Sequence, residues 1–399
     1  SYSGGSFGSK FSNPSSLPGS YRQSARFTPD DDAIICGGGG GIDTYNWNNS
    51  TGFGTKISSP SNVNFQTPAL LVGNSSGKTI GLRADMDALS MKEENNVPYK
   101  SQNEGVMHSC GHDTHTAMLL GAAKYFGENK DKLNGTLKVV FQSAEEGPMP
   151  GGGTFIVEGG YIDECDAVFG QHIGTTYEVG SIAIKPGPAM AAPDEFKITV
   201  IGTGTHASAP QTGEDPILIA AQIVQAIQNI ISRNLSPVEP AVISVCTING
   251  GTAFNIIPEK VTMSGTIRTF NEETRSMVYN RIESTVKHIT EMNNAKYELE
   301  FIKAYPPVIN DLEMSDFVIG VANELLGTEN VNILTKPSMG GEDFSYYLQK
   351  KPGAFMWLGG RKKGSNVFYN NHNPKFDIDE SSLLVGTALH INIVDKFLK

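Results

Sequence analysis

The chain has 399 residues, of which 39% are hydrophobic and 18% charged, and its formal net charge is −11 at pH 7. This length is enough for two or three domains with a large buried core. The negative charge argues against nonspecific binding to nucleic acid or to an anionic membrane surface. No apolar run reaches the roughly 18 residues of a membrane span. The sequence also shows no basic segment followed by an apolar run, so we predict no signal peptide.

Cysteine and glycine usage gives two further expectations. The four cysteines are widely scattered, which is not the pattern of a disulfide framework, so we expect a cytoplasmic protein. The first sixty residues contain 11 glycines and 12 serines. Because this composition buries little apolar surface, we expect this segment to be disordered or loop-like.

From Thr67 onward, strands and helices alternate in the pattern of an α/β fold. Apolar runs bounded by turn residues predict strands at 68–73, 79–85, 135–144 and 165–172. A helix is predicted at 114–126, with Asp113 as its N-cap. Three prolines among small residues predict a linker at 186–193.

The segment after this linker has a different pattern. Its order is strand, helix, two strands, helix and strand, which predicts a compact α+β unit of the ferredoxin-like type. Asp215 and Pro216 mark the start of its first helix, as N-cap and first-turn residue. The predicted elements lie at 194–202, 215–233, 241–250, 260–270, 273–293 and 296–305.

The rest of the chain returns to helix and strand, at 317–327, 353–360 and in a final helix from Ser381. We therefore predict an α/β fold in which a mostly parallel sheet flanked by helices is interrupted by the smaller α+β domain. The larger domain comprises residues 1–187 and 304–399, and the inserted domain comprises residues 188–303.

Residues of the types that bind metals follow several of the predicted strands. Ligands gather at the carboxyl ends of strands in open α/β sheets, so we expect these side chains to converge. The candidates next to strand ends or at the start of a helix are Asp85, Asp87, Cys110, His112, Glu145, Glu146, His172 and His372.

These candidates suit a pair of metal ions better than one. A single catalytic zinc needs three protein ligands, whereas five are available: Cys110, His112, His172, His372 and one glutamate of the adjacent pair. Cys110 is a candidate bridge, because a helix N-terminus and nearby cations favour its thiolate. The second glutamate could take a proton from a water molecule activated by the metal.

Simpler interpretations exist for each residue. A lone loop histidine is more often a surface group, glutamate pairs are common on solvated faces, and Cys110 could be a small buried hydrophobe or the nucleophile of a cysteine hydrolase. The nucleophile hypothesis leaves the glutamate pair and His372 unused. His108 and His115 are expected to be structural or to orient ligands. The coincidence of metal-binding residue types after strand ends favours the metal hypothesis.

From about Thr67 to its end, the chain resembles the amidohydrolase branch of the M20 metallopeptidases. This branch includes N-acyl-amino-acid amidohydrolases, hippurate hydrolases, auxin-conjugate hydrolases and N-acetyl-diaminopimelate deacetylases. The resemblance covers about five-sixths of the chain in the expected order. It rests on the stretches GLRADMDAL, HSCGHDTHTAML, VFQSAEEGPMPGGG, FGQH, GTHASAP, GGTAFNIIPEKVTMSGTIRTF, SMGGEDFSYYL and NHNPKFDIDESSL. Two departures are Gln211, where the branch usually has histidine, and residues 1–66, which lack the family's first helix.

The resemblance implies a role for each of these candidates. Glu145 would be the general base, and Asp87 would orient a histidine ligand. The inserted domain would be a lid that also carries the dimer contact. In this domain, His206 would stabilise the oxyanion, either within one subunit or across a subunit interface. Asn255 and Arg268 would contact the substrate carboxylate. The two metal ions would be held by Cys110, His112, Glu146, His172 and His372, with Cys110 bridging them.

These observations predict a metal-dependent hydrolase that cleaves the amide bond of an N-acyl amino acid or of a short peptide with a free carboxylate. Zinc is the expected metal, with manganese, cobalt and nickel as alternatives. We expect a homodimer or a higher homo-oligomer that binds neither nucleic acid nor membrane. The alternative functions are a carboxypeptidase or dipeptidase of the same family, a non-catalytic binding protein on this fold, and a cysteine hydrolase that uses Cys110.

Overall fold

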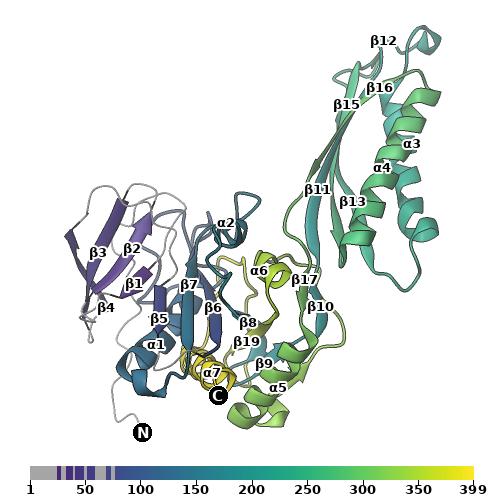
Figure 1. Ribbon diagram of the computed structural model, residues 1–399. Coiled ribbons are helices and arrows are strands. Elements are labelled where there is room, and N and C mark those ends of the chain that lie inside the picture. The colour runs from purple at the N-terminus through teal and green to yellow at the C-terminus, as the bar shows by residue number, and fades with distance from the viewer. Residues whose placement is uncertain (1–24, 28–32, 39–40, 49–51, 59–68, 73–76) are drawn as a thin grey trace. The chain divides into compact units, whose positions relative to one another are not determined.

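The computed structural model describes residues 25–27, 33–38, 41–48, 52–58, 69–72 and 77–399 (Figure 1). The chain divides into two compact units. Unit 1 comprises Ser1–Gly187, Asn310–Thr335 and Tyr346–Lys399, and unit 2 comprises Pro188–Ile309 and Lys336–Ser345. No helix in the described part of the chain has the length and apolar character needed to cross a membrane.

A seven-stranded sheet forms the centre of unit 1, in the order β18–β9–β19–β8–β6–β7–β5. Neighbouring strands from β19 to β7 run parallel, and β5 is antiparallel to β7. This arrangement confirms the predicted, mostly parallel sheet. The strands are β5 (Ala69–Val72), β6 (Thr79–Asp85), β7 (Thr136–Gln142), β8 (Ala167–Glu178), β9 (Ile182–Ile184), β18 (Val331–Ile333) and β19 (Gly353–Arg361).

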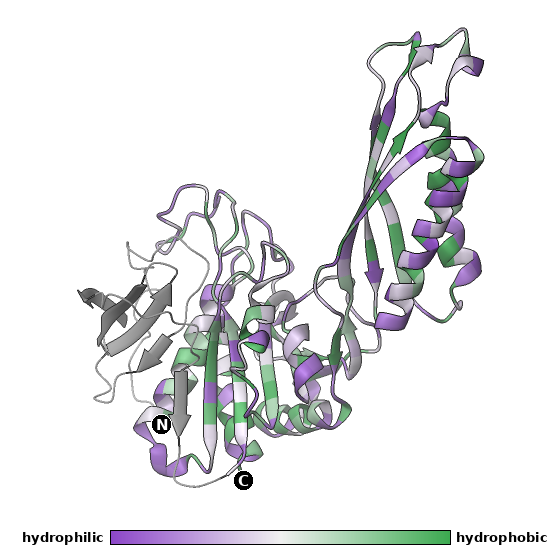
Figure 2. Ribbon diagram, turned by 45° about the horizontal axis from the view of Figure 1, so that its top comes forward, coloured by the Kyte–Doolittle hydropathy of each residue, from purple (hydrophilic) through white to green (hydrophobic). Residues whose placement is uncertain are grey.

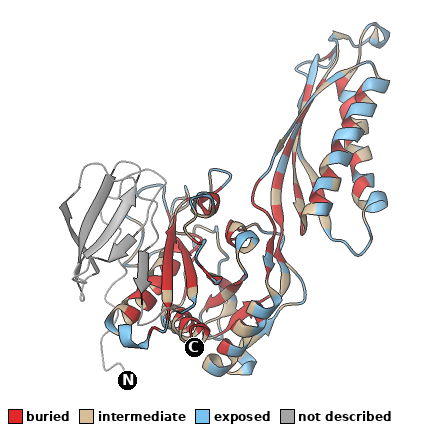
Figure 3. Ribbon diagram, in the orientation of Figure 1, coloured by how far each residue is buried: buried red, intermediate tan, exposed pale blue. Residues whose placement is uncertain are grey.

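Helices cover this sheet and bury its central strands. Helix α7 packs between α1 and α5, and these helices share one apolar core with the sheet (Figure 1). Residues 80–85 of β6 are all buried, as expected for a parallel strand covered on both faces (Figure 3). The helices are α1 (His112–Glu128), α2 (Gly152–Glu158), α5 (Leu312–Leu326), α6 (Ser345–Lys350) and α7 (Ser382–Phe397).

Helix α1 begins two residues earlier than predicted. Its N-cap is Gly111, not Asp113, and Gly111 has a left-handed backbone with φ of 84°. A Cβ atom at this position would lie 2.5 Å from Ile173 Cγ2, so both the backbone angle and the close packing favour glycine. Asp113 instead lies in the first turn, where its charge is favourable near the positive end of the helix dipole. The helix therefore starts on His112 itself.

Unit 2 has the predicted ferredoxin-like topology. Its four main strands form an antiparallel sheet in the order β13–β15–β11–β16, with two helices against it (Figure 2). The predicted N-cap is confirmed, because the Asp215 side chain accepts hydrogen bonds from the backbone N–H groups of Ile217 and Leu218. The elements are β11 (Ala192–Ile201), α3 (Pro216–Asn229), β13 (Ala241–Gly250), β15 (Lys260–Thr269), α4 (Glu272–Met292) and β16 (Lys296–Ile302).

The predicted linker at 186–193 is wrong. This segment contains β10 (Gly187–Met190) and the first residues of β11, and β10 pairs with β17 (Val308–Asn310). Ala189, Ala191 and Ala192 are fully buried. The small side chains here therefore permit close packing and do not indicate a flexible connection.

The loop-like prediction for the first sixty residues is also wrong where the structure describes them. Strands β1 (Ala25–Phe27), β2 (Ala33–Gly38), β3 (Gly41–Asn48) and β4 (Gly52–Ser58) form an antiparallel sheet in chain order. The sequence of β3, GIDTYNWN, shows why glycine content misled the prediction, because its isoleucine, threonine, tyrosine and tryptophan favour strands. The remainder of residues 1–66 lies outside the described residues.

Candidate metal centre and active site

The register of the parallel strands brings the predicted residues to one edge of the sheet. Asp85, the last residue of β6, pairs with Gln142, the last residue of β7. The loops that carry Asp87 and the glutamate pair therefore leave the sheet side by side. On the other flank of β6, Arg83 pairs with Gly170 of β8, so His172 is level with Asp85.

His172 does not follow the end of its strand, as the sequence suggested, but lies within β8. Strand β8 continues to Glu178 because β19 keeps pairing with it, with Trp357 opposite His172 and Leu358 opposite Ile173. The pairing of β6 with β8 has ended before this level, at Arg83 and Gly170. His172 therefore reaches the site from inside a strand that is paired on one side.

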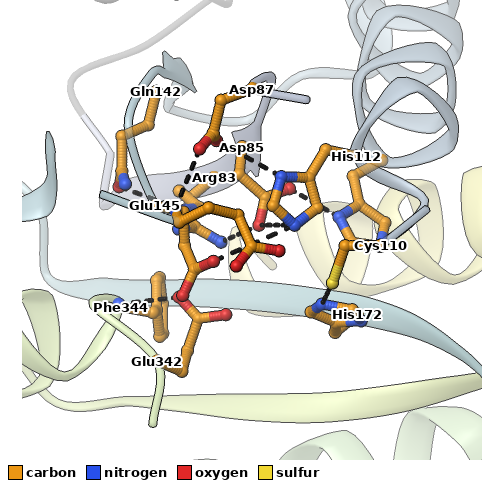
Figure 4. A network of polar contacts seen from close by, with 12 residues as sticks. Arg83, Asp85, Asp87, Cys110, His112, Gln142, Glu145, His172, Glu342 and Phe344 are labelled. Carbon is orange, nitrogen blue, oxygen red and sulfur yellow. Dashed lines mark hydrogen bonds and ion pairs between the residues drawn. The ribbon is translucent and has the colours of Figure 1, made fainter. Parts of the chain in front are cut away.

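The structure brings all five predicted metal ligands together. Cys110 Sγ lies 3.3 Å from His172 Nε2, and His372 Nε2 lies 2.9 Å from Glu146 Oε1 (Figure 4). The donor atoms of Cys110, His112 and His172 lie within 4.8 Å of one another, and so do those of Cys110, Glu146 and His372. Cys110 is common to both groups, which is the arrangement expected of a residue shared by two ions.

The partners of two imidazole rings leave one nitrogen of each directed into the cluster. His172 Nδ1 lies 2.8 Å from the Ile173 carbonyl oxygen, to which it donates, so the lone pair is on Nε2. His112 Nδ1 lies 3.2 Å from Asp87 Oδ1, so Nε2 is the nitrogen that faces the cluster, 3.5 Å from Asp85 Oδ2. His112 Nε2 is buried and has no hydrogen-bond partner among the described residues. A buried nitrogen of this kind fits a metal ligand.

Two carboxylates beside the donors are placed as the sequence suggested. Asp87 Oδ1 faces His112, and Asp87 Oδ2 accepts a 2.8 Å hydrogen bond from the backbone N–H of Glu146. Asp87 thus connects two predicted ligands. Glu145 is buried, and its Oε2 lies 4.0 Å from His112 Nε2 (Figure 4). The preceding residue, Ala144, has a left-handed φ of 60°, which turns the chain sharply after β7.

Burial and the charged neighbours shift the pKa values of the cluster in opposite directions for some of its members. Burial alone would raise the pKa of Asp85, but Arg83, His112 and His115 hold it well below its usual value. Burial would lower the pKa of His112, but Asp85 and the hydrogen bond from Asp87 raise it to about 9. Burial lowers the pKa of His172 well below its usual value.

The protein groups around Cys110 do not favour its thiolate. Burial raises the pKa of Cys110 well above its usual value, and the carboxylates of Glu146, Glu145 and Asp85 raise it further. Burial and the acidic neighbours thus act in the same direction, against ionisation of the thiol. Protein groups alone therefore keep the thiol protonated, and a directly bound cation would be needed to make it a thiolate.

The three predicted lid residues lie in unit 2, in two separate places. His206 is on β12 (Thr205–His206), which pairs with β14 (Ile256–Ile257), and the Ala207 N–H donates to the Asn255 carbonyl oxygen at 3.0 Å. His206 and Asn255 are therefore neighbours at this two-stranded sheet. Arg268 is half-buried near the opposite end of β15, where it pairs with Pro193 of β11.

Sequence reasoning expected His115 to be structural or to orient ligands, but it did not link His115 to Asp85. His115 and Asp85 are fully buried, and His115 Nδ1 lies 2.5 Å from Asp85 Oδ1. The signal was present in the spacing, because His115 is three residues after His112 on α1 and so shares its helix face.

The donor set of the cluster contains a thiol, imidazoles and carboxylates. These are ligands that zinc and other first-row divalent ions accept. Two of the donor groups share Cys110, and the buried His112 Nε2 makes no hydrogen bond to the described residues, so the residues present fit a pair of metal ions.

Comparison with known proteins gives a consistent result. The model of peptidase family M20/M25/M40 matches residues 81–396. The chain is 44% identical over 326 residues to thermostable carboxypeptidase 2 of Saccharolobus solfataricus, covering 82% of each chain. It is 39% identical over 315 residues to N-acetyl-L-cysteine deacetylase of Bacillus subtilis, covering 79% of this chain and 73% of the relative.

A solved structure supports the same assignment. A Bacillus subtilis protein described as a dinuclear metal-binding peptidase of the M20 family superposes with a TM-score of 0.70 and 33% identity, covering 82% of this chain and 84% of the other. The chain therefore belongs to peptidase family M20/M25/M40 and is a hydrolase of amide or peptide bonds.

Proposed function

We propose that the protein hydrolyses the amide bond of an N-acyl amino acid, or of a short peptide with a free carboxylate. One observation carries this proposal: five side chains of metal-binding types and a buried carboxylate, Glu145, converge at one edge of the sheet. Relatives named for deacetylation of N-acetyl-L-cysteine and for carboxypeptidase activity support both substrate classes.

Two divalent ions, with zinc proposed as the metal, would be held by Cys110, His112, Glu146, His172 and His372. Such ions polarise a carbonyl oxygen and lower the pKa of a water molecule. Cys110 would contribute to both ions, since its Sγ belongs to both donor groups. Asp87 would hold the His112 ring and the Glu146 backbone in place for binding.

Glu145 is proposed as the general base. Its carboxylate lies beside the donor cluster. Glu145 could join His112 and Glu146 in a donor group, but Glu146 and His372 form a group with Cys110 without it. Glu145 would take a proton from the attacking water and pass it to the leaving amine nitrogen. A pure binding protein would have no use for such a carboxylate, so its presence favours the enzyme over the non-catalytic alternative.

His206 is proposed to stabilise the oxyanion that forms at the scissile carbonyl. The backbone N–H of Ser208 donates to His206 Nδ1 at 3.1 Å. A neutral ring with Nδ1 as acceptor carries its hydrogen on Nε2. Since His206 is exposed, this N–H is available to donate to an oxyanion.

A homodimer is proposed because His206 and Arg268 cannot both contact one small substrate from the same chain. Between Lys260 and Arg268, β15 extends about 27 Å at a strand rise of roughly 3.4 Å per residue. The β12–β14 sheet that carries His206 lies beyond the pair of Ile201 with Lys260. This separation is several times the length of an N-acyl amino acid. One substrate would therefore be contacted by His206 and Asn255 of one subunit and by Arg268 of the other.

Cys110 is not favoured as a nucleophile. A catalytic cysteine needs a thiolate, and the protein groups around Cys110 raise its pKa. A carboxypeptidase or dipeptidase remains the second candidate, because the same site can cleave a peptide bond and the first of the relatives given above has that name.

The test is an assay of amine release from a panel of N-acyl amino acids and dipeptides, before and after chelation, with zinc, manganese or cobalt restored. The proposal predicts release that chelation abolishes and metal restores. Release that is unaffected by chelation but blocked by alkylation of Cys110 would favour the cysteine hydrolase. Metal binding without release from any substrate would favour the binding protein.

A further inference from the structure

We infer that His115 and Asp85 are positioning residues that fix the ligand His172 by holding its strand against α1, and that they thereby set the affinity of the metal centre. This inference rests on the proposed function, because it concerns the same metal centre. Neither residue is one of the five proposed ligands.

His115 forms a relay between the end of one strand and the backbone of another. Its Nδ1 donates to Asp85 Oδ1 at 2.5 Å, and its Nε2 accepts a 2.8 Å hydrogen bond from the backbone N–H of Ile173. Asp85, His112 and His115 also have donor atoms within 4.8 Å of one another, so they could be taken for a metal site of their own. Because both His115 nitrogens are already engaged, the ring cannot bind a metal without breaking this relay.

The position of the relay explains why β8 needs it. The ladder between β6 and β8 ends at Arg83 and Gly170, and β6 itself ends at Asp85. Ile173 lies three residues beyond Gly170, where β6 no longer continues to pair with it. Beyond the last β6–β8 pair, His115, held by Asp85, provides a buried acceptor for the Ile173 N–H. Without that acceptor, a buried backbone donor would be left unpaired next to the ligand.

The same ring also packs against two proposed ligands. The His115 ring centroid lies 4.6 Å from that of His172 and 5.4 Å from that of His112. His172 is tied to the same residue through its own backbone neighbour, because its Nδ1 donates to the Ile173 carbonyl oxygen. A shift of Ile173 would therefore change the direction of His172 Nε2 toward the cluster.

Asp85 is itself fixed by buried partners. Arg83 donates to its Oδ2 at 2.7 Å, and the Thr116 hydroxyl donates to its backbone carbonyl at 3.1 Å. Arg83 also donates to Gln142 Oε1 at 3.1 Å, at the end of β7. The relay is thus anchored to the two strands that carry Asp87 and the glutamate pair.

The experiment measures the dissociation constant for Zn²⁺ in the full-length protein, by competition with a chromophoric chelator, after the native metal has been removed. We compare H115Q and H115N with the wild type. Glutamine can place its side-chain oxygen near the Nε2 position and accept from Ile173, whereas the shorter asparagine can only approach Asp85. We expect H115N to weaken Zn²⁺ binding about 10- to 100-fold, and H115Q to recover most of the affinity.

The matched control is H390L, which removes another buried histidine of unit 1 whose ring makes no hydrogen bond to the described residues. H390L should bind Zn²⁺ as the wild type does. Chemical unfolding of the metal-free proteins separates a general loss of stability from a loss of affinity.

Wild-type Zn²⁺ affinity in H115N would overturn the inference, and so would equal losses in H115N and H115Q. Failure of the wild type to bind Zn²⁺ would instead refute the proposed function. The two failures are therefore distinguishable.

Discussion

The buried His390 predicts a specific loss of stability in acid. His390 lies on α7 and is 1% exposed, and neither ring nitrogen has a hydrogen-bond partner among the described residues. Burial lowers its pKa from 6.5 to about 3, and the nearby His115 adds to this shift. The folded protein therefore keeps this ring neutral at a pH where the unfolded chain protonates it.

The magnitude follows from the two pKa values. Between pH 6.5 and 3 the unfolded state binds one more proton than the folded state, so the free energy of unfolding falls as the pH falls. Each pH unit in this window costs about 1.4 kcal/mol. From pH 7 to pH 4.5, His390 should therefore remove about 2.5 kcal/mol of stability.

The assay is urea unfolding of wild type and H390L at both pH values, with chelator present so that metal ligation does not contribute. H390L should lose about 2.5 kcal/mol less than the wild type between pH 7 and pH 4.5. H288L, which changes an exposed histidine on α4, is the surface control. Equal losses in H390L and wild type would refute the reasoning.

Three further predictions concern other parts of the molecule. D87N should weaken Zn²⁺ binding about 10- to 100-fold in a chelator competition, because the carboxylate holds both His112 and the Glu146 backbone. Unchanged affinity would contradict this role. H206A and R268A should each be nearly inactive. A mixture of the two variants should recover up to about a quarter of wild-type kcat, because half of the dimers would contain one chain of each kind and each of these would have one intact site of two. No recovery after subunit exchange would contradict the shared site. D215A should destabilise unit 2 by about 1 kcal/mol in thermal unfolding, since it removes the acceptor that caps α3; an unchanged midpoint would show that the cap contributes nothing.

The sequence was sufficient for the parts of the fold that depend on local pattern. The Asp215-Pro216 start of α3 and the alternation of strands and helices in unit 2 are local signals, and the structure has both. The convergence of Cys110 and Glu146 followed from one general property, because loops after parallel strands leave a sheet at the same edge.

Other features depend on pairing and packing that no local pattern contains. His172 lies within β8 because β19 extends that strand, and a single segment does not reveal how far its partner reaches. The small residues at 186–193 look like a linker, yet Ala189 and Ala191 are buried. The pKa of Cys110 depends on three acidic residues that only the folded chain brings near it. The relay through His115 ends on a backbone N–H, which a sequence motif cannot indicate.

The central claim is that Glu145 acts as the base beside a metal pair held by other residues. The most direct measurement is kcat for amine release by E145Q, with bound metal counted in the same sample. We predict two ions per chain, as in the wild type, and a kcat lowered by about 10²- to 10⁴-fold, because glutamine has the shape of glutamate but cannot accept the proton. A wild-type kcat with both ions bound would contradict the account.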